Sequence, residues 1–96
     1  RDRYNRRAPA RVGMFDPGAT LDLAALYVRT GDPAAWDAFE SWHLCAETRV
    51  GAARWAAAVQ DAVTPLAAQS NRAWRRARHV VNTLGEHKQP QLLLRF

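Results

Sequence analysis

Apolar residues in the middle of the chain recur every three to four positions, which is the spacing of amphipathic helices. Leu23, Leu26 and Tyr27 form one such stripe. They predict a first helix that starts at about Thr20, after a turn formed by "DPG" at 16–18, and ends at Gly31, where a C-terminal glycine cap belongs.

A second helix is predicted from Pro33 to about Val50, with apolar positions at 36, 39, 43, 46 and 50. Its start is marked by "GDPAAW", in which Asp32 can cap the helix and proline suits the first helical position. Gly51 is expected to break or kink the chain because glycine weakens a helix by ~1 kcal/mol relative to alanine.

Two further helices are expected after Gly51. The third should cover about 52–63, with Trp55, Val59 and Val63 on its apolar side. In "TPLAAQ", Thr64 resembles a cap and Pro65 a first helical residue, which predicts a fourth helix from Pro65 to Leu84. The stripe expected to be buried on the fourth helix contains Leu66, Ser70, Ala73, Trp74, Ala77, Val81 and Leu84.

The predicted fold class is all-α. Alternation typical of strands is absent, apart from the last residues "QLLLRF". We expect a basic irregular arm over 1–15 and a single domain over 16–96, a compact bundle of four to five helices. Four tryptophans can each bury ~150–250 Å², and Trp36 and Trp55 are predicted to be core anchors rather than stacking platforms.

The formal net charge of +5 is unevenly distributed along the chain. Residues 1–13 hold five arginines and one aspartate, and residues 71–96 hold five arginines, one lysine and one glutamate. Residues 14–47 instead hold six acids and one arginine. A GC-rich genome would explain many arginines but not their placement, so basic clusters favour a polyanionic partner such as RNA or DNA.

The stretch "NRAWRRARH" at 71–79 carries the densest basic cluster. Arg72, Arg75, Arg76 and His79 share one helix face, with no acid three or four residues away. Arginine can hold a phosphate through two hydrogen bonds; salt bridges to distant acids and a plain solvated face are the alternatives. The predicted nucleic-acid-binding residues are Arg72, Arg75, Arg76, Arg78 and His79, joined by Arg6 and Arg7 of the arm.

Catalytic and metal chemistry is weakly represented, and we expect no enzyme activity, no metal and no cofactor. The lone Cys45 excludes an internal disulfide and favours a reducing cytoplasm. Glu40, His43 and Glu47 share a helix face that could perform acid–base work, but a buffered surface stripe is commoner. The apolar end of the chain, which closes the bundle or docks on a neighbouring subunit, contains Leu92, Leu93, Leu94 and Phe96.

The charge layout of the whole chain, mainly "NRAWRRARH", resembles the small all-helical subunit of CRISPR effector ribonucleoprotein complexes. The resemblance implies a non-catalytic antiviral-defence subunit whose copies stack head to tail beside guide or target nucleic acid. One alternative is an adaptor or antitoxin-like module that binds an acidic protein. Another is a helix-turn-helix regulator reading bases through Arg54, Gln60 and Asp61. No apolar run approaches bilayer length, so no membrane partner is expected.

Overall fold

The computed structural model describes residues 16–84 as four α-helices. They are α1 (Pro17–Thr30), α2 (Pro33–Val50), α3 (Ala52–Ala67) and α4 (Asn71–Asn82). No strand occurs within this range, so the all-α prediction is confirmed there. The predicted arm, with Arg6 and Arg7, and the apolar end from Leu92 to Phe96 lie outside the described residues.

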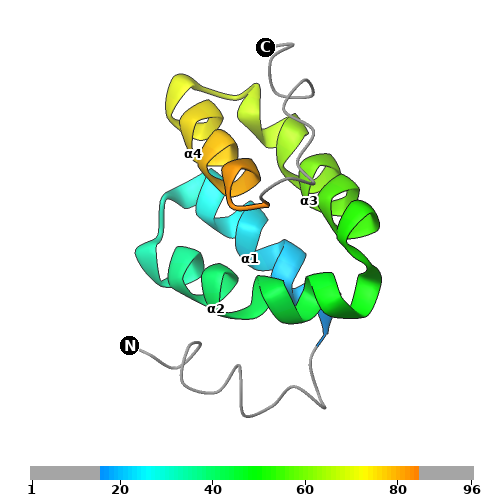
Figure 1. Cartoon of the computed structure of the whole chain (residues 1–96). Coiled ribbons are helices and arrows are strands. Elements are labelled where there is room, and N and C mark those ends of the chain that lie inside the picture. Colours follow the sequence, from blue (N-terminus) through cyan, green and yellow to red (C-terminus); the bar gives the residue numbers. More distant parts are fainter. Residues whose placement is uncertain (1–15, 85–96) are drawn as a thin grey trace.

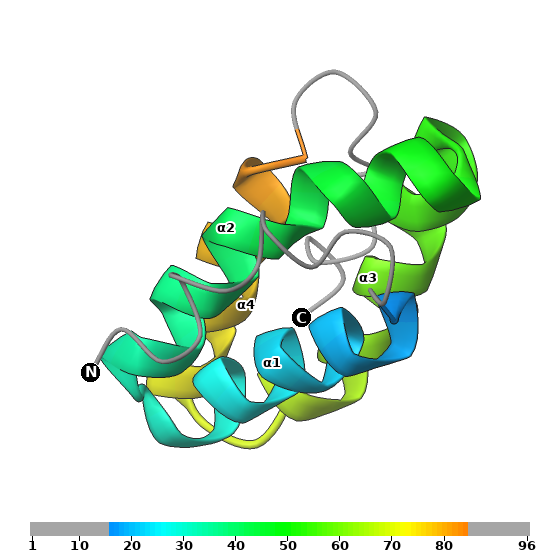
Figure 2. The same ribbon diagram turned by 90° about the horizontal axis from the view of Figure 1, so that it is seen from below.

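Helix α1 lies at the centre of the bundle and packs against each of the other three helices (Figure 1). Helix α3 also packs against both α2 and α4. Seen from below, α1 and α2 run side by side along the same part of the bundle (Figure 2). None of the described helices has the length and apolar character needed to cross a membrane.

The "DPG" segment begins a helix, and the prediction of a turn there is wrong. Asp16 is the N-cap of α1: its carboxylate accepts a hydrogen bond from the backbone N–H of Gly18 at 2.9 Å. Asp32 caps α2 in the same way, through the N–H of Ala34 at 2.9 Å. Proline follows each aspartate, and its missing N–H costs nothing at the first helical position.

Glycine ends both of the first two helices, as predicted. Gly31 has φ 75° and Gly51 has φ 103°, a backbone conformation that side chains disfavour. The N–H of Gly31 caps the carbonyl of Tyr27, and that of Gly51 caps the carbonyl of Glu47. A single residue, Gly51, therefore separates α2 from α3 at the predicted boundary.

The predicted boundary between the third and fourth helices is wrong. Helix α3 continues through Pro65 to Ala67, and α4 begins only at Asn71, with Ser70 as its cap. Pro65 sits in the last turn of α3 and is exposed, while Val63 and Ala67 are buried beside it. Burial of these two residues favours helix continuation over the start signal of "TP".

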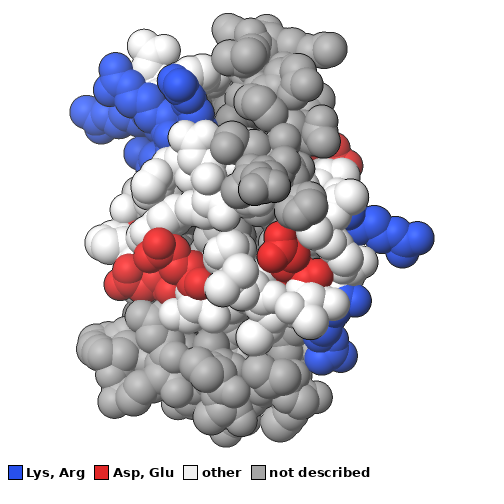
Figure 3. Space-filling view, in the orientation of Figure 1, with Lys and Arg blue, Asp and Glu red and all other residues white. Residues whose placement is uncertain are grey.

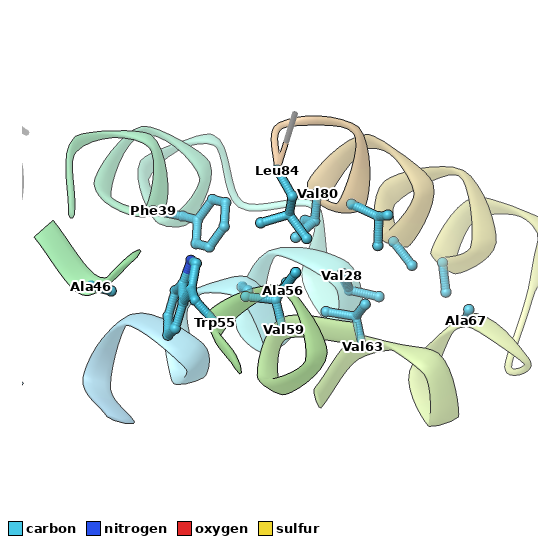
Figure 4. Close-up of a cluster of buried hydrophobic side chains, with 14 residues drawn as sticks. Val28, Phe39, Ala46, Trp55, Ala56, Val59, Val63, Ala67, Val80 and Leu84 are labelled. Atoms are coloured by element: carbon cyan, nitrogen blue, oxygen red, sulfur yellow. The ribbon is translucent and has the colours of Figure 1, made fainter. Parts of the chain in front are cut away.

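The core is built largely from small side chains (Figure 4). Among residues 16–84, half of the sixteen buried hydrophobic residues are alanines, and only Trp55 and Phe39 are large aromatic residues. On α1 the buried stripe is shifted from the predicted one, because Leu23, Leu26 and Tyr27 are only partly buried. The fully buried residues of that helix are Thr20, Ala24 and Val28.

Candidate nucleic-acid interface

Helix α4 presents most of the predicted basic residues to solvent. Its start is set by Ser70, whose hydroxyl accepts a hydrogen bond from the N–H of Ala73 at 3.0 Å, so Ser70 is an exposed cap rather than a buried residue. The helix buries Ala73, Ala77, Val80 and Val81 against the bundle. The residues left exposed on the other side include Arg72, Arg75, Arg78 and His79.

The exposed arginines of α4 have no acidic partner among residues 16–84. Arg72 and Arg75 make no hydrogen bond or ion pair in that range, and Arg78 lies over the ring of Trp74, 5.1 Å from its centroid. Figure 3 shows the resulting basic cluster over α4. These three arginines follow one another at intervals of three residues along α4, and all three side chains are exposed to solvent.

Arg76 has a structural role that the sequence did not reveal. Its Nε donates to the carbonyl of Val28 at 2.9 Å, and its NH2 group donates to the carbonyl of Arg29 at 3.3 Å. These carbonyls belong to the last turn of α1, where a cation also meets the negative end of the helix dipole. Arg76 is half-buried because it neighbours Ala73 and Val80 at the edge of the buried stripe.

His79 lies on an aromatic cluster formed by three helices. Its imidazole stacks on the indole of Trp36, with ring centroids 4.1 Å apart and planes at 28°. Tyr27 lies 5.1 Å from Trp36 and 6.2 Å from His79, between ring centroids. Trp36 is only partly buried, so it packs against the core while also carrying His79 on its face.

Sequence reasoning missed this aromatic cluster because it assigned Tyr27 and Trp36 to separate apolar stripes. The sequence feature that could have indicated this cluster is the short connection between α1 and α2, which consists of Gly31 and Asp32. So short a connection brings the last turn of one helix beside the first turn of the next. The approach of α4 to that corner could not be inferred from local spacing.

An acidic surface on α2 lies beside the basic cluster of α4. Figure 3 shows acidic atoms over α2, separated from the basic cluster by uncharged atoms. Asp37 and Glu40 are both exposed on the first half of that helix. The electrostatic potential therefore favours negative charge over α4 and disfavours it over α2.

The packing of His43 favours a structural role for this side chain over a role in proton transfer. Its imidazole stacks on Phe39, with centroids 5.3 Å apart and planes at 14°. Its Nδ1 is buried without a hydrogen-bond partner among residues 16–84. Burial lowers the pKa of His43 below 6.5, and this outweighs the opposite influence of Glu47 and then Glu40.

The lowered pKa of His43 predicts a loss of stability in mild acid. The unfolded chain binds a proton at its ordinary pKa, whereas the folded chain resists protonation, so this contribution is present above 6.5 and is lost as pH falls through the folded pKa. Urea unfolding between about pH 7 and 5 should show a steeper decline for the native chain than for His43→Phe. Parallel declines in the two proteins would contradict this expectation.

The α2–α3 pair lacks the geometry expected of a helix-turn-helix. Such motifs join their helices through a turn of about three to four residues, whereas Gly51 alone separates α2 from α3. Gln60, one of the three candidate base readers, is fully buried. These two observations argue against base reading by α3.

No metal site accompanies the basic cluster in the described part of the chain: residues 16–84 contain no group of three or more His, Cys, Asp or Glu side chains able to hold an ion. Cys45 is a partly buried free thiol. Comparison of the chain with protein-family models, curated proteins and solved structures gives no match.

Proposed function

We propose that this protein binds nucleic acid through phosphate contacts made by α4, without catalysis and with little reading of base sequence. The observation that carries the proposal is the exposed set Arg72, Arg75 and Arg78, which has no acidic partner among residues 16–84. Guanidinium groups fit phosphate oxygens through paired hydrogen bonds, and an array of them follows a charged backbone.

The lack of any acidic residue within α4 itself distinguishes this helix from an ordinary solvated one. Exposed helices commonly mix signs, because oppositely charged pairs one turn apart add ~0.2–0.5 kcal/mol each. On α4 the arginines instead lie within one or two turns of one another. Their mutual repulsion is relieved when a polyanion binds, so the unbound surface favours such a partner.

Salt dependence provides the direct test of phosphate contact. The logarithm of affinity for a generic oligonucleotide should fall linearly with the logarithm of salt concentration, because bound phosphates release counterions. Changing Arg72, Arg75 or Arg78 singly to alanine should flatten that slope by about 0.7–0.9 each. Fluorescence anisotropy titrations at several salt concentrations measure both quantities.

Arg54→Ala provides the matched control, since Arg54 is exposed on α3 rather than α4. It should leave both affinity and slope unchanged. An affinity that ignores salt and is equally indifferent to Arg72→Ala and Arg75→Ala would exclude the proposal. Arg76 is unsuitable for this series because its substitution also removes contacts to α1.

The setting that we propose is a cytoplasmic ribonucleoprotein in which this chain is a helical subunit, of the kind that its CRISPR-subunit resemblance implies. Separate acidic and basic surfaces on α2 and α4 also suit head-to-tail contacts between copies. Purification from the native host, followed by sequencing of bound nucleic acid, tests this setting. Recovery of an acidic protein without nucleic acid would favour the adaptor alternative.

A further inference from the structure

We infer that the nucleic acid bound by α4 is single-stranded and that one of its bases stacks on His79. This inference rests on the proposed function and adds the class of ligand to it. The observations behind it are the stacked pair His79 and Trp36 and their position at the end of the arginine series.

His79 has the exposure and support that a stacking surface needs. One face of its imidazole is held by Trp36, at 4.1 Å between centroids, and the residue as a whole is exposed. Tyr27 packs beside both rings, so the imidazole is fixed by side chains from α1 and α2. A base that stacks on the outer face meets an already oriented ring, which limits the entropy lost on binding.

The arginines are placed to hold the phosphates that flank such a base. His79 follows Arg75 by four residues and Arg72 by seven, so the three side chains emerge on one face over two turns. Seven residues rise ~10 Å along a helix axis, close to three nucleotides of a stacked strand at ~3.4 Å each. The site therefore covers roughly three nucleotides.

A duplex cannot use this arrangement, because its base faces are covered by neighbouring base pairs. Single-strand binders combine a basic path for the backbone with aromatic side chains that accept any base, since every base has a π face. Phosphate contacts alone would not distinguish the two forms. Stacking on His79 is what adds a preference for single strands.

The exposed acids on α2 favour the same orientation of the bound strand, with its phosphates on α4 and a base over His79. Asp37 and Glu40 are exposed on the helix that supplies Trp36. Phosphates are repelled from that side and stay on α4, whereas an uncharged base can lie over the aromatic cluster. The charge distribution therefore favours an orientation in which a base, rather than the phosphate backbone, lies over His79.

The test compares three fluorescent probes of equal length with the full 96-residue chain at one salt concentration. They are a single-stranded DNA oligonucleotide, the same strand as a duplex, and a strand of abasic phosphodiester units. The single strand should bind about tenfold tighter than the abasic strand, the size expected from one stacked base. His79→Ala should remove most of that difference, by weakening binding of the single strand far more than binding of the abasic strand.

Two variants separate stacking from charge and from folding. His79→Phe keeps an aromatic ring and should preserve the preference, while Arg75→Ala should weaken binding of single and abasic strands alike. Thermal melts of each variant show whether the fold is retained. Equal affinity for all three probes, unaffected by His79→Ala, would overturn the stacking inference and leave phosphate binding intact; no binding of any probe would overturn both.

Discussion

Replacing Trp55 with alanine is expected to lower the free energy of unfolding by ~3–5 kcal/mol, the usual cost of removing a large buried aromatic side chain. Trp55 is 1% exposed and belongs to the main hydrophobic cluster. Many of its neighbours in that cluster are alanine and valine, whose short side chains cannot extend into the space left behind. A domain typically has only ~5–15 kcal/mol of stability, so a large part of it would be lost.

Thermal unfolding followed by circular dichroism measures this effect, and a fall in Tm of at least ~12 °C is expected. Leu44→Ala is the matched control, because Leu44 is 61% exposed and its truncation should change stability by less than ~0.5 kcal/mol. Trp55→Phe should lower the free energy of unfolding less than Trp55→Ala does. One reason is that it removes a buried indole N–H that has no hydrogen-bond partner within residues 16–84. Figure 4 shows that indole nitrogen turned toward Phe39. A Trp55→Ala protein that melts like the Leu44 variant would refute the role of Trp55 in the core.

Arg76→Ala is expected to destabilise the fold by about 1–2 kcal/mol, whereas Arg75→Ala should be nearly neutral. Arg76 holds two carbonyl groups at the end of α1, and its loss leaves them without this partner. Its guanidinium also packs over Gly31, where an added Cβ would lie 3.3 Å from Arg76 NH1. The expected loss of stability is modest because the side chain of Arg76 is only half-buried.

Urea unfolding of the two single variants provides the comparison, since Arg75 and Arg76 are adjacent and chemically identical. The sequence predicted one shared helix face for both residues and placed neither on the buried stripe. The structure corrects this for Arg76, where a glutamate would face the negative end of the α1 dipole. Indistinguishable stabilities for Arg75→Ala and Arg76→Ala would show that the contacts of Arg76 to α1 contribute nothing.

Helix start and stop signals predicted a helix boundary correctly where backbone preferences of neighbouring residues fix that boundary. The predicted span of α2, from Pro33 to Val50, matches the structure, because an aspartate cap, a proline and a terminal glycine act within a few residues. The same aspartate–proline pair at Asp16 was misread as a turn, although it follows the same physics. The residues Asp16 and Pro17 therefore did signal a helix start, and the prediction of a turn was a wrong interpretation of them.

The boundary between α3 and α4 could not be obtained from local signals. "TP" occurs at helix starts and, less often, inside helices, where the missing N–H of proline costs one hydrogen bond. The burial of Val63 and Ala67 against the bundle offsets that cost. Only the position of the other helices determines which of these two effects is larger.

Local sequence patterns were sufficient to predict the all-α class, two of the three connections between helices, and the basic character of the segment at 71–79. These follow from spacing and backbone preference, which act over a few residues. Tertiary structure alone decided that Arg76 holds α1 while Arg72 and Arg75 stay unpaired within residues 16–84, and that His79 rests on Trp36. Those contacts join residues more than forty positions apart, and they depend on how the helices pack rather than on what any one helix contains.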